Sequence, residues 1–232
     1  MRIWVTRAAP GAEGTARRLR RMGHAPIIAP VLEVRHVADP KPDLTGVGAL
    51  AFTSRNGVAA FAAVCAERDL PVFAVGAATA SAARAKGFRQ VRSARGDVAA
   101  LARLVASRRG VFSGAVLHLG AREPAGDLPA ELAAKGIAAR RHVVYATEVV
   151  EPPLAASAAL TARPIEIDAL IVHSPRAAHR LAEIDVLART ASELTVYCIS
   201  EAAAEPLRRL NFRRVVVAPH PDEAALLDLI AS

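Results

Sequence analysis

The fold is decided by residues Leu50–Ala80, which read LAFTSRNGVAAFAAVCAERDLPVFAVGAATA. The apolar run Ala49–Phe52 gives way to the polar cluster Thr53–Gly57, and a helix-like run of Ala, Val and Phe follows. A second apolar run, Val72–Val75, stops at Gly76 and precedes another helical pattern. This alternation of strands, polar turns and helices is typical of a parallel α/β sheet. Such sheets bind ligands where strands end and helices begin, and the helix N–H groups there favour anions, so we expect the site at these two turns.

The composition is that of a globular protein. The chain has 232 residues, of which 53% are hydrophobic and 22% charged, which argues against a disordered chain. No apolar run approaches the ~18 residues that a membrane span needs. The N-terminus enters a strand without a signal-peptide segment, so we expect no membrane association. Cys65 and Cys198 lie far apart in apolar patterns and are expected to be free thiols in the reducing cytoplasm.

The net charge of +8 indicates a partner that carries negative charge. Genome base composition alone would also produce the bias, because nearly all the basic residues are arginines. The basic residues are spread along helices and few aromatic side chains are available for stacking, which argues against a nucleic-acid partner. A small polyanion held in a cleft fits the charge better.

The second half of the chain repeats the first. The matching pairs are Thr6–Gly23 with Gly120–Gly136, Leu50–Gly57 with Leu170–Ala177, and Phe73–Phe88 with Tyr197–Phe212. A repeat of this size predicts two similar α/β domains. The best linkers, at about residues 31–43 and 143–160, combine extended patterns with prolines. Two crossings imply insertion, so we predict a discontinuous domain of residues 1–34 and 152–232, an inserted domain of residues 38–145, and a cleft between them.

Element boundaries elsewhere follow from the same patterns. Asp97 and Asp222 are expected to cap the N-termini of helices Val98–Arg108 and Glu223–Ile230. Three further segments are predicted, namely a turn at Gly120–Arg122 after strand Ala115–Leu119, one helix from Ser174 to about Arg189, and one helix from Ser200 through Leu210.

Six short segments carry a more specific signal. They are WVTR near the start, AFTSRNGV at Ala51–Val58, AVGAATA at Ala74–Ala80, VVYAT at Val143–Thr147, VHSP at Val172–Pro175, and APHPDEAALL near the C-terminus. In this order and spacing they resemble the uroporphyrinogen-III synthase family nearly end to end. The resemblance implies two flavodoxin-like domains, one of them discontinuous, joined by a two-stranded ladder at the two linkers.

The resemblance also implies an activity. Members of the family are lyases of haem biosynthesis that cyclise hydroxymethylbilane, a linear tetrapyrrole with eight carboxylates, with inversion of the last pyrrole ring and loss of water. No metal or organic cofactor takes part. Loss of the terminal hydroxyl gives an azafulvene, which the last ring attacks, whereas uncatalysed closure gives the isomer without inversion. The enzyme must therefore hold a flexible chain in one conformation and assist hydroxyl loss. We expect a cytoplasmic monomer.

Tyr145 is the expected catalytic residue, because it falls where the family has its motif tyrosine. A phenol is a weak acid that can hydrogen-bond to or protonate the leaving hydroxyl. The alternative is a half-buried tyrosine of the ladder whose hydroxyl lies in water.

The expected substrate-binding residues share a position at strand ends and helix starts, where they could meet carboxylates. They are Arg7, Thr53, Ser54, Asn56, Gly76, Thr79, Arg122, Ser174 and Arg176. Structural alternatives stay open for several of them. Hydroxyl and amide side chains can cap helices, Thr79 can satisfy local backbone groups, and Arg7 and Arg122 can pair with neighbouring acids.

Two departures from the family bear on activity. The second glycine turn reads Ile199–Ala204, with Ser200 and Ala203 in place of glycine and threonine and with Glu201 added near a site for an octa-acid. His173 also stands where the family often has threonine. These changes favour weaker carboxylate contacts on that side, or the alternative function of a non-catalytic module that binds a tetrapyrrole or another polyanion.

Other chemistries find little support in the sequence. The chain has no dinucleotide or P-loop glycine motif, no nucleophile elbow and no zinc-protease motif. Its seven histidines show no tight metal-ligand spacing, so no metal is expected. His118 and His173 end strands, where they could face the cleft or form ordinary hydrogen bonds.

Overall fold

The computed structural model describes residues 1–9, 11–37, 41–124 and 126–231. The chain divides into two compact units, which are described separately below. Unit 1 comprises Met1–Glu33 and Glu148–Ser232, and unit 2 comprises Val34–Thr147. Residues 38–40, in the first linker expected from the sequence, lie outside the described residues.

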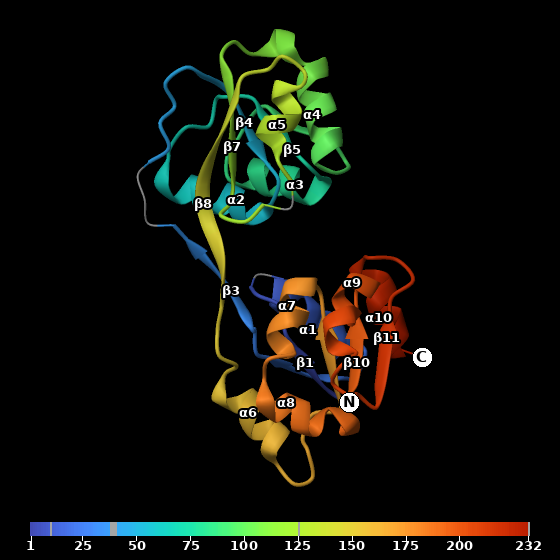
Figure 1. The fold of residues 1–232 in the computed structure, drawn as a ribbon. Coiled ribbons are helices and arrows are strands. Elements are labelled where there is room, and N and C mark those ends of the chain that lie inside the picture. The colour runs from blue at the N-terminus through green and yellow to red at the C-terminus, as the bar shows by residue number, and fades with distance from the viewer. Residues whose placement is uncertain (10, 38–40, 125, 232) are drawn as a thin grey trace. The chain divides into compact units, whose positions relative to one another are not determined.

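Unit 1 is built on a five-stranded parallel sheet with the order β11-β10-β9-β1-β2 (Figure 1). Its strands are β1 (Arg2–Val5), β2 (Ala25–Ile28), β9 (Ala169–Val172), β10 (Thr195–Cys198) and β11 (Arg214–Val217). Its helices are α1 (Gly11–Arg21), α6 (Leu154–Thr161), α7 (Pro175–Leu181), α8 (Asp185–Thr190), α9 (Glu201–Ala204) and α10 (Glu223–Ala231), with 3₁₀ turns at Ala191–Glu193 and Glu205–Leu207.

Apolar side chains on both faces of this sheet explain why helices cover both. Ile3 and Val5 of β1 pack against α1 and α10, whereas Trp4 between them packs with α6, α7, α8 and α9. All three side chains are fully buried. A strand that is apolar at consecutive positions belongs inside a parallel sheet, and β1 lies between β9 and β2.

Unit 2 has the sheet order β3-β8-β7-β4-β5-β6. Its strands are β3 (Leu32–His36), β4 (Val47–Phe52), β5 (Val72–Ala74), β6 (Val91–Ser93), β7 (Ala115–Ala121) and β8 (Ala139–Val149). Its helices are α2 (Arg55–Val64), α3 (Ala77–Ala85), α4 (Val98–Ser107) and α5 (Leu128–Ala133), with a 3₁₀ turn at Arg109–Val111. The pairs from β8 to β6 are parallel.

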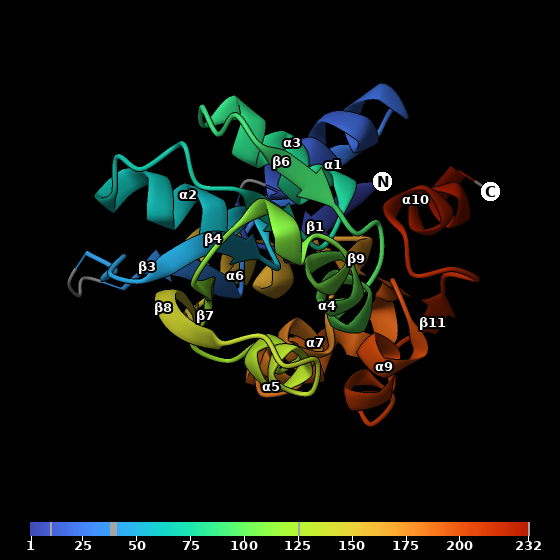
Figure 2. The same cartoon turned by 90° about the horizontal axis from the view of Figure 1, so that it is seen from above.

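The two faces of this sheet are also covered. Leu50 and Phe52 of β4 pack with α2 and α3, whereas Ala49 and Ala51 pack with α4 and α5. Figure 2 shows α2 and α3 on one side of the sheet and α4 and α5 on the other. The fold is therefore the parallel α/β architecture that the sequence predicts, with two sheets in one chain.

The internal repeat reappears in the strand order. When repeat partners are matched, β11-β10-β9-β1-β2 of unit 1 corresponds to β6-β5-β4-β7-β8 of unit 2. In unit 1 the helices that follow the neighbouring strands β9 and β1 lie on opposite faces of the sheet. The same holds in unit 2 for the helices that follow β4 and β7. The gap between such strands, at their carboxyl ends, is the usual ligand site of an open α/β sheet.

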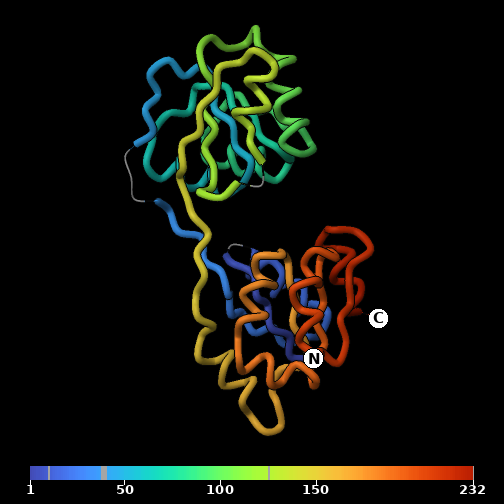
Figure 3. Tube along the Cα trace, viewed as in Figure 1, coloured from blue at the N-terminus to red at the C-terminus, as the bar shows by residue number. Residues whose placement is uncertain are grey.

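The chain passes between the units through β3 and β8 (Figure 3). Val37 N donates to Val144 O, and Val150 N donates to Val31 O. Because residue numbers increase along one segment as they decrease along the other, the two segments pair antiparallel.

Several predicted boundaries were wrong. Residues Gly120 and Ala121 continue β7 instead of forming a turn, because they pair with Val143 and Tyr145 across a register shift. Helix α6 begins at Leu154, inside the segment 143–160, where the alanine-rich sequence favours a helix. The helix predicted from Ser174 to Arg189 is interrupted before α8, where Ile184 is extended and buried against the core. The helix predicted from Ser200 becomes a 3₁₀ turn at Glu205–Leu207, where Pro206 removes a backbone donor.

Candidate functional site

A cavity of about 580 Å³ opens in unit 2 at the carboxyl ends of β4 and β7. It lies at the gap between strands where ligands are expected. The residues that line it are Thr53, Ser54, Val75, Asp97, Val98, Ala99, Ala121, Glu123, Pro124, Gly126, Tyr145 and Thr147. The cavity therefore brings together three of the predicted site residues, namely Thr53, Ser54 and Tyr145.

Ser54 links helix α2 to Tyr145. Its backbone is extended, with φ −151° and ψ 158°, and its Oγ accepts a hydrogen bond from Gly57 N at 3.0 Å. The same oxygen lies 2.8 Å from the Tyr145 hydroxyl. Ser54 is thus the N-cap of α2 and a cavity residue at once, and the capping alternative is true alongside its place in the cavity.

Tyr145 reaches the cavity from β8. Its side chain packs into the core beneath α2 and α3, and only 8% of the residue is exposed. Its hydroxyl contacts Ser54 Oγ at the wall of the cavity. A phenol that is held by one hydrogen bond at a cavity wall can present the rest of its bonding capacity to a ligand.

The Thr53 side chain contacts a buried histidine of the neighbouring strand. Thr53 Oγ1 lies 3.2 Å from His118 Nε2, and His118 is fully buried in β7. Burial, and to a smaller extent the charge of Arg141, lowers the pKa of His118 to about 4, while Asp127 opposes the change. His118 is therefore neutral near pH 7, and its Nε2 holds the Thr53 hydroxyl in position.

Several residues at the cavity were missed as site residues. Asp97, Val98 and Ala99 lie at the start of α4. Glu123 follows β7, and Thr147 is the last residue of the motif VVYAT. Asp97 Oδ1 caps α4 by accepting from Ala100 N at 2.8 Å, as the sequence predicts. The available signal was position, because Gly96 and Asp97 also follow a strand and precede a helix.

The other predicted residues of unit 2 do not line this cavity. Asn56 lies in the first turn of α2 and Thr79 is buried in the first turn of α3. Gly76 is the N-cap of α3 without a side-chain hydrogen bond. Arg122 is exposed after β7, and its backbone N donates to Tyr145 O at 2.9 Å. Of these four residues, Arg122 is tied most directly to the position of Tyr145.

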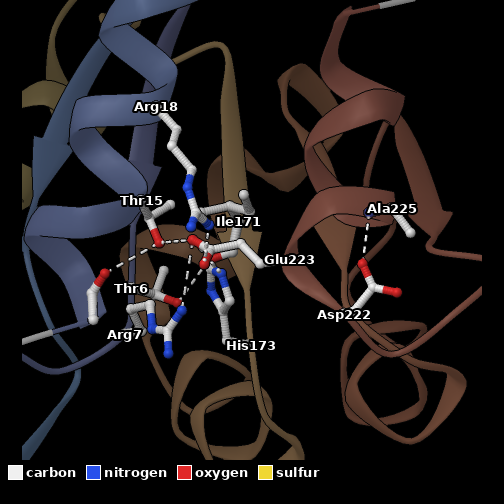
Figure 4. Close-up of polar contacts among 10 residues, drawn as sticks. Thr6, Arg7, Thr15, Arg18, Ile171, His173, Asp222, Glu223 and Ala225 are labelled. Carbon is white, nitrogen blue, oxygen red and sulfur yellow. Dashed lines mark hydrogen bonds and ion pairs between the residues drawn. The ribbon is translucent and has the colours of Figure 1, made fainter. Parts of the chain in front are cut away.

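The predicted residues of unit 1 gather at the equivalent edge of its sheet. Arg7 follows β1 and pairs with Glu223 at 3.7 Å, so the alternative of a neighbouring acid holds for this arginine. Ser174 caps α7 by accepting from Ala177 N at 3.2 Å, as Ser54 caps α2. Arg176 is half-buried in the first turn of α7. His173 is almost completely buried beside Glu223 (Figure 4).

The departure at Ile199–Ala204 is accommodated within unit 1. Ser200 caps α9 by accepting from Ala203 N at 3.3 Å. Arg208 Nε donates to Glu201 Oε1 at 3.1 Å, which offsets the added negative charge. The serine thus caps a helix that a glycine would leave without a side-chain cap.

Two negative observations concern the described residues alone. No group of three or more His, Cys, Asp or Glu side chains in this part of the chain could hold a metal ion. No helix within the described ranges is long and apolar enough to cross a bilayer.

Comparisons with known proteins agree on one family. The family model for uroporphyrinogen-III synthase HemD matches residues 13–228. The crystal structure of uroporphyrinogen-III synthetase from Helicobacter pylori is similar with a TM-score of 0.65 and 19% identity, over 99% of this chain and 97% of that chain. A mutant uroporphyrinogen III synthase from Thermus thermophilus gives a TM-score of 0.52 and 18% identity, over 99% and 97%. No curated protein sequence matches the chain.

The two solved structures establish the fold alone, because a sequence identity below 20% does not extend to the function. The family model covers nearly the whole chain and includes every cavity residue named above. The chain therefore belongs to the uroporphyrinogen-III synthase family, lyases of haem biosynthesis.

Proposed function

We propose that the cavity of unit 2 holds the reacting end of hydroxymethylbilane and that Tyr145 is the catalytic residue that assists loss of its terminal hydroxyl. The observation that carries this proposal is the 2.8 Å contact between the Tyr145 hydroxyl and Ser54 Oγ at the cavity wall.

The hydrogen bonds around Ser54 are compatible with a phenol that donates to the substrate. Ser54 Oγ accepts a hydrogen bond from Gly57 N and keeps its own proton, and either hydroxyl of the Ser54–Tyr145 pair can be the donor. If Ser54 donates to the Tyr145 oxygen, the phenolic proton points away from Ser54. The substrate hydroxyl would then accept this proton as its C–O bond breaks and leave as water, while the pyrrole nitrogen supplies the electron pair.

The charges of the cavity suit the ring that is left behind. Protonation and departure of the hydroxyl generate positive charge on the azafulvene before its proton is lost. Asp97 lines the cavity, and its Oδ1 is the atom that caps α4. Its carboxylate would stabilise that charge or accept a pyrrole N–H, so the cavity suits a pyrrole ring better than a carboxylate.

The substrate carboxylates are assigned to the remaining predicted residues. We infer that Thr53, Asn56, Gly76, Thr79 and Arg122 of unit 2, and Arg7, Ser174 and Arg176 of unit 1, contribute hydroxyl, amide, backbone and guanidinium donors. Units 1 and 2 would then be the two predicted domains of a cytoplasmic monomer that binds no nucleic acid. Their free thiols Cys65 and Cys198 fit a reducing compartment.

The test is turnover of freshly generated hydroxymethylbilane, with type I and type III uroporphyrin separated after oxidation. We expect type III in excess, and a loss of about 10²-fold in Tyr145→Phe, the size of a general-acid contribution. Tyr197→Phe is the matched control, since Tyr197 is the only other tyrosine and lies in β10 of unit 1.

Two results would contradict the proposal. A fully active Tyr145→Phe variant would remove the catalytic assignment. Only type I product, at the rate without protein, would remove the enzyme, and tight tetrapyrrole binding in that sample would indicate the non-catalytic module instead.

A further inference from the structure

The edge of unit 1 that corresponds to the cavity of unit 2 is filled by charged side chains. By the internal repeat, His173 follows β9 as Thr53 follows β4. Glu223 begins α10 after the cap Asp222 as Val98 begins α4 after the cap Asp97. Thr53 and Val98 line the open cavity. Their counterparts His173 and Glu223 lie against each other, with His173 Nε2 4.0 Å from Glu223 Oε1.

The Glu223 carboxylate is surrounded by donors from two elements. Arg18 of α1 binds Oε2 at 2.5 Å, and Thr15 of α1 donates to Oε1 (Figure 4). Arg7, after β1, reaches Oε1 at 3.7 Å, which makes this the longest of the three contacts. The arrangement is that of an anion site in which the anion belongs to the chain itself.

The sequence leaves room for Arg7 in this cluster. A Cβ at Gly11 would lie 2.5 Å from the Arg7 Nε and 2.6 Å from its Cζ. Any larger residue at the start of α1 would therefore displace the guanidinium from its place beside Glu223.

His173 supplies the second, independent sign of a ligand. Its side chain is only 6% exposed, and both ring nitrogens are buried without a hydrogen-bond partner among the described residues. A neutral imidazole has one N–H donor and one acceptor, and leaving both unused in the interior is costly. The ring thus holds an unused donor beside Arg7 and Glu223.

We propose that Arg7, Arg18 and His173 form a carboxylate-binding site that Glu223 now occupies, and that a carboxylate of the substrate takes this site by displacing Glu223. The substrate identity rests on the proposed function, whereas the site itself does not. Helix α10 holds Glu223 at this position, so displacement requires a substrate that other groups of unit 1 already bind and that presents its next carboxylate at high local concentration.

The first experiment tests the site without catalysis. In full-length Glu223→Ala, the melting temperature is measured against propionate, with sodium chloride at equal ionic strength as the reference salt. We expect a lower melting temperature that propionate restores saturably and chloride does not. The matched control is Glu201→Ala, which removes the carboxylate of an exposed ion pair with Arg208 in the same unit. If Glu223→Ala does not fold, Glu223→Gln is titrated in the same way.

Equal responses of the Glu223 and Glu201 variants, or no difference between propionate and chloride, would overturn the site. The wild-type chain should respond to both salts alike, because its own carboxylate holds the position.

The second experiment tests displacement. In Glu223→Gln the competing charge is lost, so the KM for hydroxymethylbilane should fall by about threefold, the value of a partly exposed ion pair, while kcat changes less. A raised KM would mean that Glu223 positions Arg7 instead, and would overturn the displacement. If the wild-type chain had no activity, the proposed function would fail while the propionate experiment would still decide whether the site exists.

Discussion

The Ser54 side chain belongs to helix α2 and to the cavity through the same oxygen. Replacing it with alanine removes the cap and the contact with Tyr145 together. We expect Ser54→Ala to lose about 1 kcal/mol of the free energy of unfolding, the usual value of a cap, and to lose about tenfold in kcat. Urea unfolding and the initial rate of type III formation measure the two effects.

The control for this prediction is Ser200→Ala, which removes the cap of α9 and touches no tyrosine in the contacts described above. It should lose stability of the same order and keep its kcat. If the two variants lost activity equally, the effect of Ser54→Ala would come from stability alone.

Asp97 offers a second prediction at this scale. Asparagine caps helices about as well as aspartate, so Asp97→Asn should keep its stability. Loss of the charge facing the cavity should lower kcat by about five- to tenfold, since a charge near the reacting ring contributes on the order of 1 kcal/mol. Asp222→Asn, which makes the same change at the cap of α10, should leave kcat unchanged. Equal rates for wild type and Asp97→Asn would exclude an electrostatic role.

Single residues were predicted well where the cause is local. Asp97 and Asp222 cap their helices as their sequence positions predict, because a cap depends on three or four neighbouring residues. Glu223 was not predicted as a partner of Arg7, because the two lie near opposite ends of the chain and only the sheet brings them together. Likewise the Tyr145 contact with Ser54 depends on the pairing of β7 with β8 and β4, which no local pattern reveals.

Helix α2 approaches strand β7 at Gly57, and this close packing sets the position of the cavity wall. A Cβ at Gly57 would lie 2.7 Å from the backbone oxygen of Leu119. Gly57→Ala should therefore push α2 away from the sheet and lower the free energy of unfolding by about 1–3 kcal/mol, as overpacking does. Chemical denaturation measures the loss.

Gly14 in α1 is the matched position, because a Cβ built there has no atom of the described residues within 4 Å apart from its chain neighbours and the backbone of its own helix. Gly14→Ala should stabilise the protein by up to about 1 kcal/mol, since alanine favours a helix more than glycine does. A stabilising Gly57→Ala variant would show that α2 can shift freely.

Elements were predicted where periodicity is clear and missed where tertiary contacts decide. The sequence shows no breaker between α7 and α8, and the chain is extended there because Ile184 is buried in the core. Gly120 and Ala121 look like a turn in isolation but extend β7, since β8 supplies pairing partners beyond the expected strand end.

At the scale of the whole molecule, each unit contains one histidine whose side chain is buried, His118 within β7 and His173 directly after β9. Burial lowers the pKa of both to about 4, with Arg141 acting on His118 and Arg7 on His173, while Asp127 and Glu223 oppose the change. In the unfolded chain the pKa of both should lie near 6.5. The unfolded state then binds more protons between these values, so stability is complete above pH 6.5 and is lost as pH falls toward 4.

Each histidine should contribute a slope of about 1 kcal/mol per pH unit in this window. Urea unfolding at pH 7, 6 and 5 measures it. His173→Thr should remove the contribution of His173 to the pH dependence of the free energy of unfolding and leave that of His118. An unchanged slope in this variant would mean that His173 is already protonated in the folded protein.

The two units share one strand order, but the chain enters them differently. Unit 2 is a continuous segment, whereas β1 of unit 1 finds its neighbour β9 only when Ile3 pairs with Ala169. A ribosome makes all of unit 2 before it makes β9. Unit 2 can therefore fold while the sheet of unit 1 still lacks three of its five strands, and the nascent chain must keep the apolar strands β1 and β2 from aggregating during that interval.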